Sequence, residues 1–242
     1  MVKEDFLWEG GPRFLFDSSL FPPTTDSFAL GYFARPGRGG AVCDLGCGTG
    51  LLGTLLLARD ASLRLVNVER SGEALALARR GFAENGWQAD YREGDLRDVY
   101  TLPAAGSIDY AVCNPPYFPA GSGKSHAQLP NERGETGCTL DDVCAAAGRI
   151  LRWGGRFALV HRPERLTDLL CALRVHGIEP KRLRFLCRRA DAAPSLVLVE
   201  ARRGGKPGLA IEPPLAVDSP EWEAVYFRDR SGADACGKTE NR

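Results

Sequence analysis

Near the middle of the chain, the segment IDYAVCNPPYF joins an apolar run to an amide, two prolines and two aromatic rings. The apolar run predicts a buried strand, so the polar residues should follow its carboxyl end. The side-chain oxygen of Asn114 and the carbonyl of Pro115 could accept the two hydrogens of an amino group. Pro115 and Pro116 would stiffen this loop, because proline fixes φ. The rings of Tyr117 and Phe118 could stack on a planar base. The segment therefore indicates a pocket for an amine on a planar group.

A second motif, AVCDLGCGTG, occupies residues 41–50. Gly46, Gly48 and Gly50 allow a tight turn and close approach of the backbone to a ligand, and Thr49 lies within the same loop. Their spacing is GxGxG, whereas dinucleotide-binding loops have GxGxxG. The preceding Asp44 would repel a phosphate but attract the ammonium of an amino-acid group. The motif therefore favours S-adenosylmethionine over NAD.

Two further acids follow predicted strands. Glu69 ends the segment LRLVNVE, 21 residues after Gly48. A carboxylate at the tip of a second strand can accept hydrogen bonds from both hydroxyls of a ribose. Asp95, in EGDLRD after a third strand, is placed to bind the amino group of adenine. We expect both acids to belong to the cofactor site.

These motifs are held by apolar patterns that alternate between strand and helix. Strands are expected at 41–45, 63–69, 89–94, 108–113, 156–161, 183–187 and 195–201, and helices at 51–59, 72–85, 140–151 and 164–176. Such alternation predicts an α/β, Rossmann-like, doubly wound sheet that is mostly parallel and has seven strands. The final helix–strand–strand run predicts that the last strand is antiparallel. A short helix is expected with Thr25 or Asp26 as its N-cap, and the chain beyond Gly204 looks like a proline-rich loop.

Composition narrows the class of protein. The 242 residues are 44% hydrophobic and 26% charged, with a formal net charge of zero, as in ordinary globular proteins. The eight cysteines form no CxxC pair, and the three histidines are scattered, so we expect free thiols and no metal. The chain has neither a signal-length apolar run at its start nor a run long enough for a membrane span. We expect a cytoplasmic monomer.

Basic residues are concentrated in the second half of the chain. Residues 152–206 contain thirteen Lys or Arg and five Asp or Glu, a net charge of +8 in a neutral protein. This asymmetry favours a surface for a polyanion. Arg188 and Arg189 are the candidates within it for binding nucleic acid. Lys124 and Arg133, in a long segment without periodicity, should contact phosphates near the target base.

The combination of DLGCGTG with NPPYF resembles the class I N6-adenine and related amino-methyltransferases. TDSFALGYFA is similar to that family's entry helix, whose acid would be Asp26 beside the cofactor. RGE, GGRFALVHRPERL and PGLAIEPPL resemble the tRNA adenine-N6 methyltransferase branch that modifies the adenine beside the anticodon of a valine tRNA. This branch often has ARHE where the present chain has ERGE, and the prolines at Pro22 and Pro23 are also unusual.

The resemblance implies methyl transfer from S-adenosylmethionine to N6 of an adenine in tRNA. It implies catalytic roles for Asn114, Pro115 and Tyr117, a cofactor contact by Asn114, and base contacts by Pro116 and Phe118. The expected organisation is an N-terminal segment, 1–40, that covers the cofactor site, a methyltransferase domain, 41–204, and a C-terminal tail, 205–242.

Four alternatives stay open. Glutamine methylation of a protein release factor would suit the same pocket, although that family carries a helical domain before its glycine loop. DNA adenine methyltransferases usually carry a separate base-recognition domain, which is not evident here. A cofactor-binding protein that has lost catalysis would not need an intact Asn114 and Tyr117. The glycine spacing disfavours an NAD enzyme.

Overall fold

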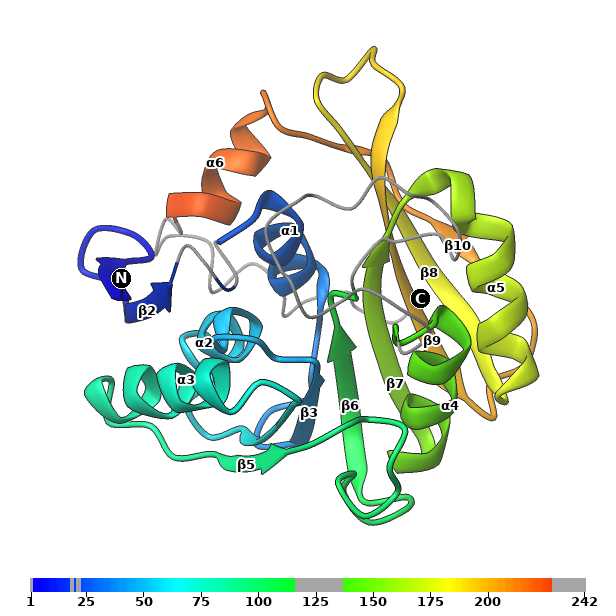
Figure 1. The fold of residues 1–242 in the computed structure, drawn as a ribbon. Helices are drawn as coiled ribbons and strands as arrows, with labels where there is room; N and C mark the ends of the chain where they lie inside the picture. The colour runs from blue at the N-terminus through cyan, green and yellow to red at the C-terminus, as the bar shows by residue number, and fades with distance from the viewer. Residues whose placement is uncertain (1, 18–19, 21–22, 116–136, 228–242) are drawn as a thin grey trace.

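The computed structural model describes residues 2–17, 20, 23–115 and 137–227 of the chain. A central sheet lies between two layers of helices (Figure 1). Its main strands follow the order β8-β9-β7-β6-β3-β4-β5. They are β3 (Ala41–Leu45), β4 (Arg64–Glu69), β5 (Asp90–Glu93), β6 (Ile108–Cys113), β7 (Leu151–His161), β8 (Ile178–Cys187) and β9 (Pro194–Arg203).

Pairing within the sheet follows the predicted pattern. The five strands β7, β6, β3, β4 and β5 are parallel to one another, whereas β9 is antiparallel to both β7 and β8. The strand order reverses between β3 and β6, since the chain moves from β3 toward β4 and β5 and then returns. The prediction of a doubly wound, mostly parallel sheet with an antiparallel last strand is confirmed.

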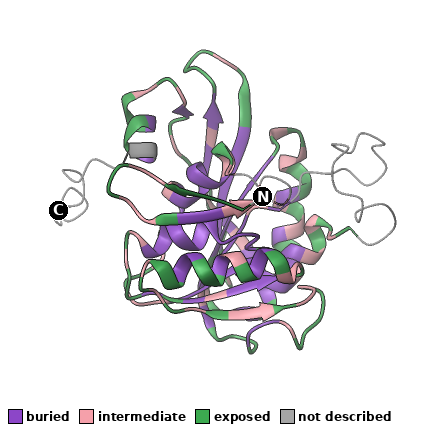
Figure 2. Ribbon diagram, turned by 60° about the vertical axis from the view of Figure 1, so that its left-hand side comes forward, coloured by how far each residue is buried: buried purple, intermediate pink, exposed green. Residues whose placement is uncertain are grey.

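The helices divide between the two faces of the sheet. Apolar residues of α1 (Thr25–Phe33), α2 (Leu51–Leu57) and α3 (Gly72–Glu84) pack in one cluster with Val42 and Val112 of the sheet. Residues of α4 (Leu140–Ile150) and α5 (Leu166–Val175) pack in a second cluster with Cys43 and Ala111. Cys43 follows Val42 in β3, and Ala111 precedes Val112 in β6. Successive strand residues face opposite sides, so each strand contributes to both clusters. The buried residues therefore concentrate on the strands and the inner sides of the helices (Figure 2).

Helix starts follow local chemistry. At the start of α4, the Thr139 hydroxyl accepts from the Asp142 amide and the Asp142 carboxylate accepts from the Thr139 amide, which is a capping box. The Ser71 hydroxyl accepts from the amide of Ala74 at the start of α3. α1 follows Thr24, which makes no side-chain cap hydrogen bond. The expectation that Thr25 or Asp26 precedes this helix is therefore wrong by one or two residues.

β7 and β8 are longer than predicted. β7 begins at Leu151 rather than 156, because Ile108 of β6 already pairs with Leu151 and the register shifts after this pair. Gly154 lies inside the strand with φ +80°. Such a residue permits a local irregularity without ending the strand. β8 begins at Ile178, opposite Arg203 of β9, before the apolar run becomes evident.

Regular structure extends toward both ends of the described range. β1 (Val2–Phe6) and β2 (Arg13–Asp17) form an antiparallel hairpin. Beyond Gly204, the two-residue strands β10 (Ala210–Ile211) and β11 (Leu215–Ala216) pair in parallel with β8, and α6 (Pro220–Phe227) follows. Trp222 and Val225 of α6 are buried in the same cluster as α1. The expectation of a loop beyond Gly204 is therefore wrong for 210–227. A strand of two residues, such as β10 or β11, is too short to show periodicity in the sequence.

Within the part of the chain that the structure describes, no helix is long and apolar enough to cross a membrane.

Candidate active site

Most of the predicted cofactor residues meet at the carboxyl ends of four adjacent strands. Asp44 is near the end of β3, Glu69 ends β4, Asp95 follows β5 and Asn114 follows β6. The sheet brings these ends to one edge, and the reversal of strand order lies between β3 and β6. In open α/β sheets, ligands bind in the crevice beside such a reversal.

The glycine-rich loop connects β3 directly to α2, as predicted. Gly46, Gly48 and Gly50 have φ angles of 74°, 53° and 85°, which L side chains rarely adopt. The Gly46 amide donates to the carbonyl of Val68 at 2.8 Å, so the loop is fixed to the end of β4. An added Cβ at Gly46 would meet no atom within 4 Å, so this part of the loop faces open space.

Gly50 and Thr49 of the glycine-rich loop are buried against the rest of the protein. A Cβ at Gly50 would lie 2.9 Å from the Cβ of Ala78, and Phe82 is almost as close. Gly50 is therefore required for the approach of α3 to α2. Thr49 is 4% exposed, which places it beneath the loop surface. Its cofactor role stays a prediction.

Asp44 is fully buried, and neither of its carboxylate oxygens makes a hydrogen bond of ordinary geometry with the described residues. Burial raises the pKa of Asp44 to about 8, the nearby Glu69 carboxylate acts in the same direction, and the backbone amide of Gly53 opposes them only weakly. A buried, unsatisfied carboxyl group is costly unless a donor or a cation completes it. The site is therefore suited to a ligand with an ammonium group.

Glu69 is held by two backbone amides. Its Oε2 accepts from Gly48 at 2.9 Å and its Oε1 accepts from Ser71 at 2.8 Å. The side chain is nearly buried, at 9% exposure. These contacts fix the carboxylate between the glycine loop and the start of α3, so it is preorganised at the end of β4.

Asp95 is bound to a neighbour in this structure. Its Oδ1 accepts from the amide and Nε of Arg97, and its Oδ2 accepts from Nη2 at 2.6 Å. The hydrogen bond from the Arg97 side chain lowers the pKa of Asp95. Asp95 is thus an ionised acceptor, and a ligand amino group would have to share it with Arg97.

Asn114 contacts the first turn of α1. Its Nδ2 donates to the hydroxyl of Ser27 at 3.0 Å, across 87 positions of sequence. Ser27 is 8% exposed, and the adjacent Asp26 is half-buried in the same turn. Pro115 is buried directly after Asn114. The structure thus brings the predicted entry helix to the predicted amine pocket.

Several predicted residues cannot be placed. Pro116, Tyr117, Phe118, Lys124 and Arg133 lie outside the described residues. Their roles stay predictions.

Arg188 and Arg189 are exposed in the loop between β8 and β9, beyond the carboxyl end of β8. This hairpin projects at the top of Figure 1, toward which the arrow of β6 also points. Arg189 forms an ion pair with Asp191 at 3.1 Å. Because β8 and β6 run in the same direction, both arginines belong to the end of the sheet that carries Asn114.

The basic stretch 152–206 does not form one face. Arg152, Arg156 and Arg202 lie at the amino end of β7 and the adjoining end of β9, opposite to Arg188. Within the described part of the chain, seven of the thirteen basic residues pair with a carboxylate: Arg152, Arg156, Arg165, Arg174, Arg182, Arg184 and Arg189. The net charge of the stretch therefore overstates any single basic surface.

Sequence reasoning missed two polar residues. Ser27 makes the contact that orients Asn114, and only the fold brings it there. Asn67 is fully buried in β4, opposite Asp44 in the register, and its amide atoms have no partner among the described residues. An asparagine within the apolar run LRLVNVE was the available signal. No group of three His, Cys, Asp or Glu side chains suited to a metal occurs among the residues described.

Known structures share this fold. A solved structure of a predicted O-methyltransferase from Agrobacterium tumefaciens superposes with a TM-score of 0.69, over 84% of this chain and 95% of that one, at 20% identity. The sheet and the site at its carboxyl edge thus define a Rossmann-like methyltransferase fold. Residues 28–170 match the Methyltransferase small domain, so the chain belongs to that family.

Two relatives carry a more specific name, tRNA1(Val) (adenine(37)-N6)-methyltransferase. The protein of Dickeya chrysanthemi is 30% identical over 185 residues, which cover 75% of this chain and 73% of the relative. That of Phocaeicola vulgatus is 27% identical over 175 residues, with 72% and 74% covered. The predicted methyltransferase class and the resemblance to the tRNA adenine-N6 branch are confirmed.

Proposed function

We propose that the protein transfers a methyl group from S-adenosylmethionine to N6 of an adenine in tRNA, beside the anticodon. The observation that carries this proposal is the anchored amide of Asn114, at the carboxyl end of β6 and beside the glycine loop. Ser27 accepts from the Asn114 nitrogen. This contact orients the amide so that its oxygen becomes the acceptor for a substrate amine.

The residues present suit the cofactor. Buried Asp44, which lacks an ordinary hydrogen-bond partner, would receive the ammonium of the methionine moiety. Glu69 would bind the ribose hydroxyls, Asp95 the adenine amino group, and the open face of Gly46 would admit the ligand to the backbone. When bound, S-adenosylmethionine supplies an electrophilic methyl group on a positively charged sulfur.

Catalysis would depend on placement. The amine of adenine is a weak nucleophile, because its lone pair is delocalised into the ring. The oxygen of Asn114 and the carbonyl of Pro115 would accept its two hydrogens, orient the nitrogen in line with the methyl group and stabilise the charge that develops on it. Tyr117 and Phe118 would stack on the flipped base. No general base is required during the transfer itself.

The choice of tRNA rests on the relatives. Two of them are named for adenine 37 of tRNA1(Val), and each match covers about three quarters of the relative. Arg188 and Arg189 extend from the same end of the sheet and would bind the RNA backbone. We further propose that the protein acts in the cytoplasm as a monomer without a metal.

The test uses labelled S-adenosylmethionine with total tRNA, ribosomal RNA, DNA and soluble protein in parallel, followed by nucleoside and amino-acid analysis. We expect N6-methyladenosine in tRNA. Label confined to ribosomal RNA or DNA would overturn the choice of nucleic acid. Label confined to protein glutamine would assign the same pocket to an amide substrate.

A further inference from the structure

Two neighbouring cavities lie at the amino ends of the parallel strands, the edge opposite to the candidate active site. One has a volume of about 270 Å³ and the other of about 540 Å³. Arg35 and Arg156 line both cavities. The other basic lining residues are Arg38, Arg152, Lys181, Arg182 and Arg202, against the acids Glu200 and Asp109.

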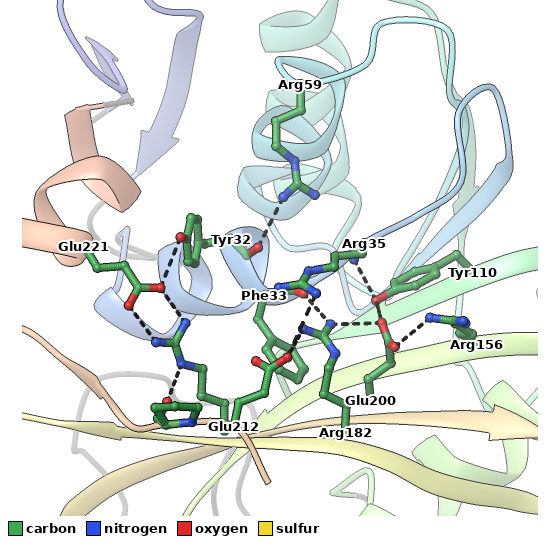
Figure 3. Close-up of polar contacts among 12 residues, drawn as sticks. Tyr32, Phe33, Arg35, Arg59, Tyr110, Arg156, Arg182, Glu200, Glu212 and Glu221 are labelled. Carbon is green, nitrogen blue, oxygen red and sulfur yellow. Dashed lines mark hydrogen bonds and ion pairs between the residues drawn. The ribbon is translucent and has the colours of Figure 1, made fainter. Parts of the chain in front are cut away.

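The two acids are already satisfied by protein donors. Glu200, 2% exposed, accepts from Arg156 at 3.1 Å through Oε1, and from Arg182 at 3.2 Å and the Tyr110 hydroxyl at 2.6 Å through Oε2 (Figure 3). Asp109 receives Arg152 on Oδ1 and the backbone amide of Ala41 on Oδ2. Neither carboxylate is therefore available to neutralise further cations.

Several cations of the lining have no such partner. Among the described residues, no carboxylate lies within salt-bridge distance of Arg38, Lys181 or Arg202, and Arg38 acts on the Asp60 carboxylate only from beyond that distance. Arg35 approaches Glu212 only at 4.0 Å, and its side chain is 62% exposed. The lining thus has an excess of positive charge at solvent-accessible guanidinium groups. Guanidinium groups in this setting are suited to phosphate oxygens.

The exposed indole ring of Trp153 lies beside the basic residues that line the cavities. Trp153 is 75% exposed, and its six-membered ring lies against Gly204, where an added Cβ would meet it at 2.3 Å. The neighbouring Gly154 lines the larger cavity, and a Cβ there would lie 3.3 Å from a guanidinium nitrogen of Arg202. An indole beside arginines provides a stacking surface next to a phosphate-binding surface, as in sites for nucleic-acid strands.

We infer that this edge, the amino-end surface, binds the sugar–phosphate backbone of RNA, with a base stacked on Trp153. The surface comprises Arg35, Arg38, Trp153, Arg156 and Arg202. Two adjacent cavities that share two arginines suit successive phosphates better than one free anion. The inference rests on the proposed function for the identity of the nucleic acid, which would be the substrate RNA.

The amino-end surface cannot hold the target base. β3 contributes five residues between the two edges, which is roughly 16 Å at the rise of an extended chain. The RNA bound there must therefore be a segment of the substrate remote from the methylated adenine. Such contacts would position the RNA without touching the reacting atoms, so they should change its KM and leave kcat unaltered.

The test compares Arg38→Ala/Arg202→Ala with the wild type in binding of fluorescein-labelled total tRNA at several salt concentrations. Neither arginine pairs with a buried acid, so the fold should be retained, and thermal unfolding checks this. We expect about tenfold weaker binding and a salt slope smaller by about 1.4, for two lost phosphate contacts. KM for tRNA should rise about tenfold, while kcat is unchanged.

Arg80→Ala/Arg174→Ala is the matched control, since it removes two exposed arginines from α3 and α5. Trp153→Ala should weaken binding roughly tenfold without changing the salt slope, and Trp153→Phe should restore most of it. Wild-type affinity and slope in Arg38→Ala/Arg202→Ala would overturn the inference, and so would equal losses in the control. Because binding is measured without methyl transfer, a failure of the proposed reaction is distinguishable from a failure of this surface.

Discussion

The side-chain amide of Asn114 donates to the hydroxyl of Ser27 at 3.0 Å, which joins the end of β6 to the first turn of α1. The contact holds the amide nitrogen of Asn114 against α1. It also makes the position of α1 a condition for a correctly oriented Asn114.

Asn114→Ala should abolish methyl transfer and leave cofactor affinity nearly unchanged. The loss of a preorganised hydrogen-bonding group at the reacting centre typically lowers kcat by about a hundredfold or more. Turnover with labelled donor and calorimetry with S-adenosylhomocysteine would measure the two quantities. Normal turnover would contradict the proposed pocket.

Ser27→Ala should lower kcat roughly fivefold, because a lost hydrogen bond worth about 1 kcal/mol would let the Asn114 amide adopt other orientations. The KM for the methyl donor should stay the same. Thr25→Ala is the control, since it removes an exposed hydroxyl from the same turn. Equal losses in both variants would show a general disturbance of α1 instead of a lost contact to Asn114.

Asp44→Asn should weaken cofactor binding and, without cofactor, stabilise the protein. In the wild type, the pKa of Asp44 is raised from 3.8 to about 8, chiefly by burial. The folded state therefore binds a proton more tightly than the unfolded state, and stability falls as pH rises between these values. The gain in Tm of Asp44→Asn should increase over the same range. A lower Tm in the variant, or unaltered affinity, would refute this account.

The same pKa predicts how cofactor affinity depends on pH. Below about 8, Asp44 is mostly protonated in the ligand-free protein, whereas an ammonium group prefers the ionised carboxylate. Affinity for S-adenosylhomocysteine should therefore rise up to tenfold per unit as pH increases toward 8, with release of a proton on binding. Calorimetry in buffers of different ionisation enthalpy would detect that proton. Asp44→Asn should lose the dependence, and an unchanged profile in that variant would assign the proton to another group.

Arg188→Ala/Arg189→Ala should weaken tRNA binding and reduce its salt slope by about 1, somewhat less than two full contacts. The reduction is partial because Arg189 is already paired with Asp191. Anisotropy titrations over a series of salt concentrations would give the slope. If the slope equals that of the wild type, the β8–β9 loop is not part of the RNA-binding surface.

Much of the fold could be predicted because the core strands are apolar and sharply bounded. β6 matches its predicted range, 108–113, since the apolar run ends at Asn114 and Pro115. β7 and β8 exceed their apolar runs because pairing with β6 and β9 extends them. β10, β11 and α6 were missed, because their order depends on contacts with β8 and α1.

The residues of the candidate site that lie at the carboxyl ends of strands could be predicted from the sequence. Asp44, the glycine loop, Glu69 and Asn114 converge because parallel strands bring their carboxyl ends to one edge. Contacts between distant segments were not predictable. The Ser27 contact spans 87 positions. The bidentate pair of Arg184 with Glu221 joins β8 to α6. Tyr32 of α1 also donates to Glu221 (Figure 3).

The most direct measurement of the central claim is methylation of an unmodified valine tRNA transcript, followed by mass spectrometry of the anticodon loop. The proposal predicts one N6-methyladenosine beside the anticodon with the wild type, none with Asn114→Ala, and none when that adenine is replaced by guanine. Equal labelling of the replaced transcript, or no methylation of the wild-type transcript by a protein that binds S-adenosylhomocysteine, would contradict it.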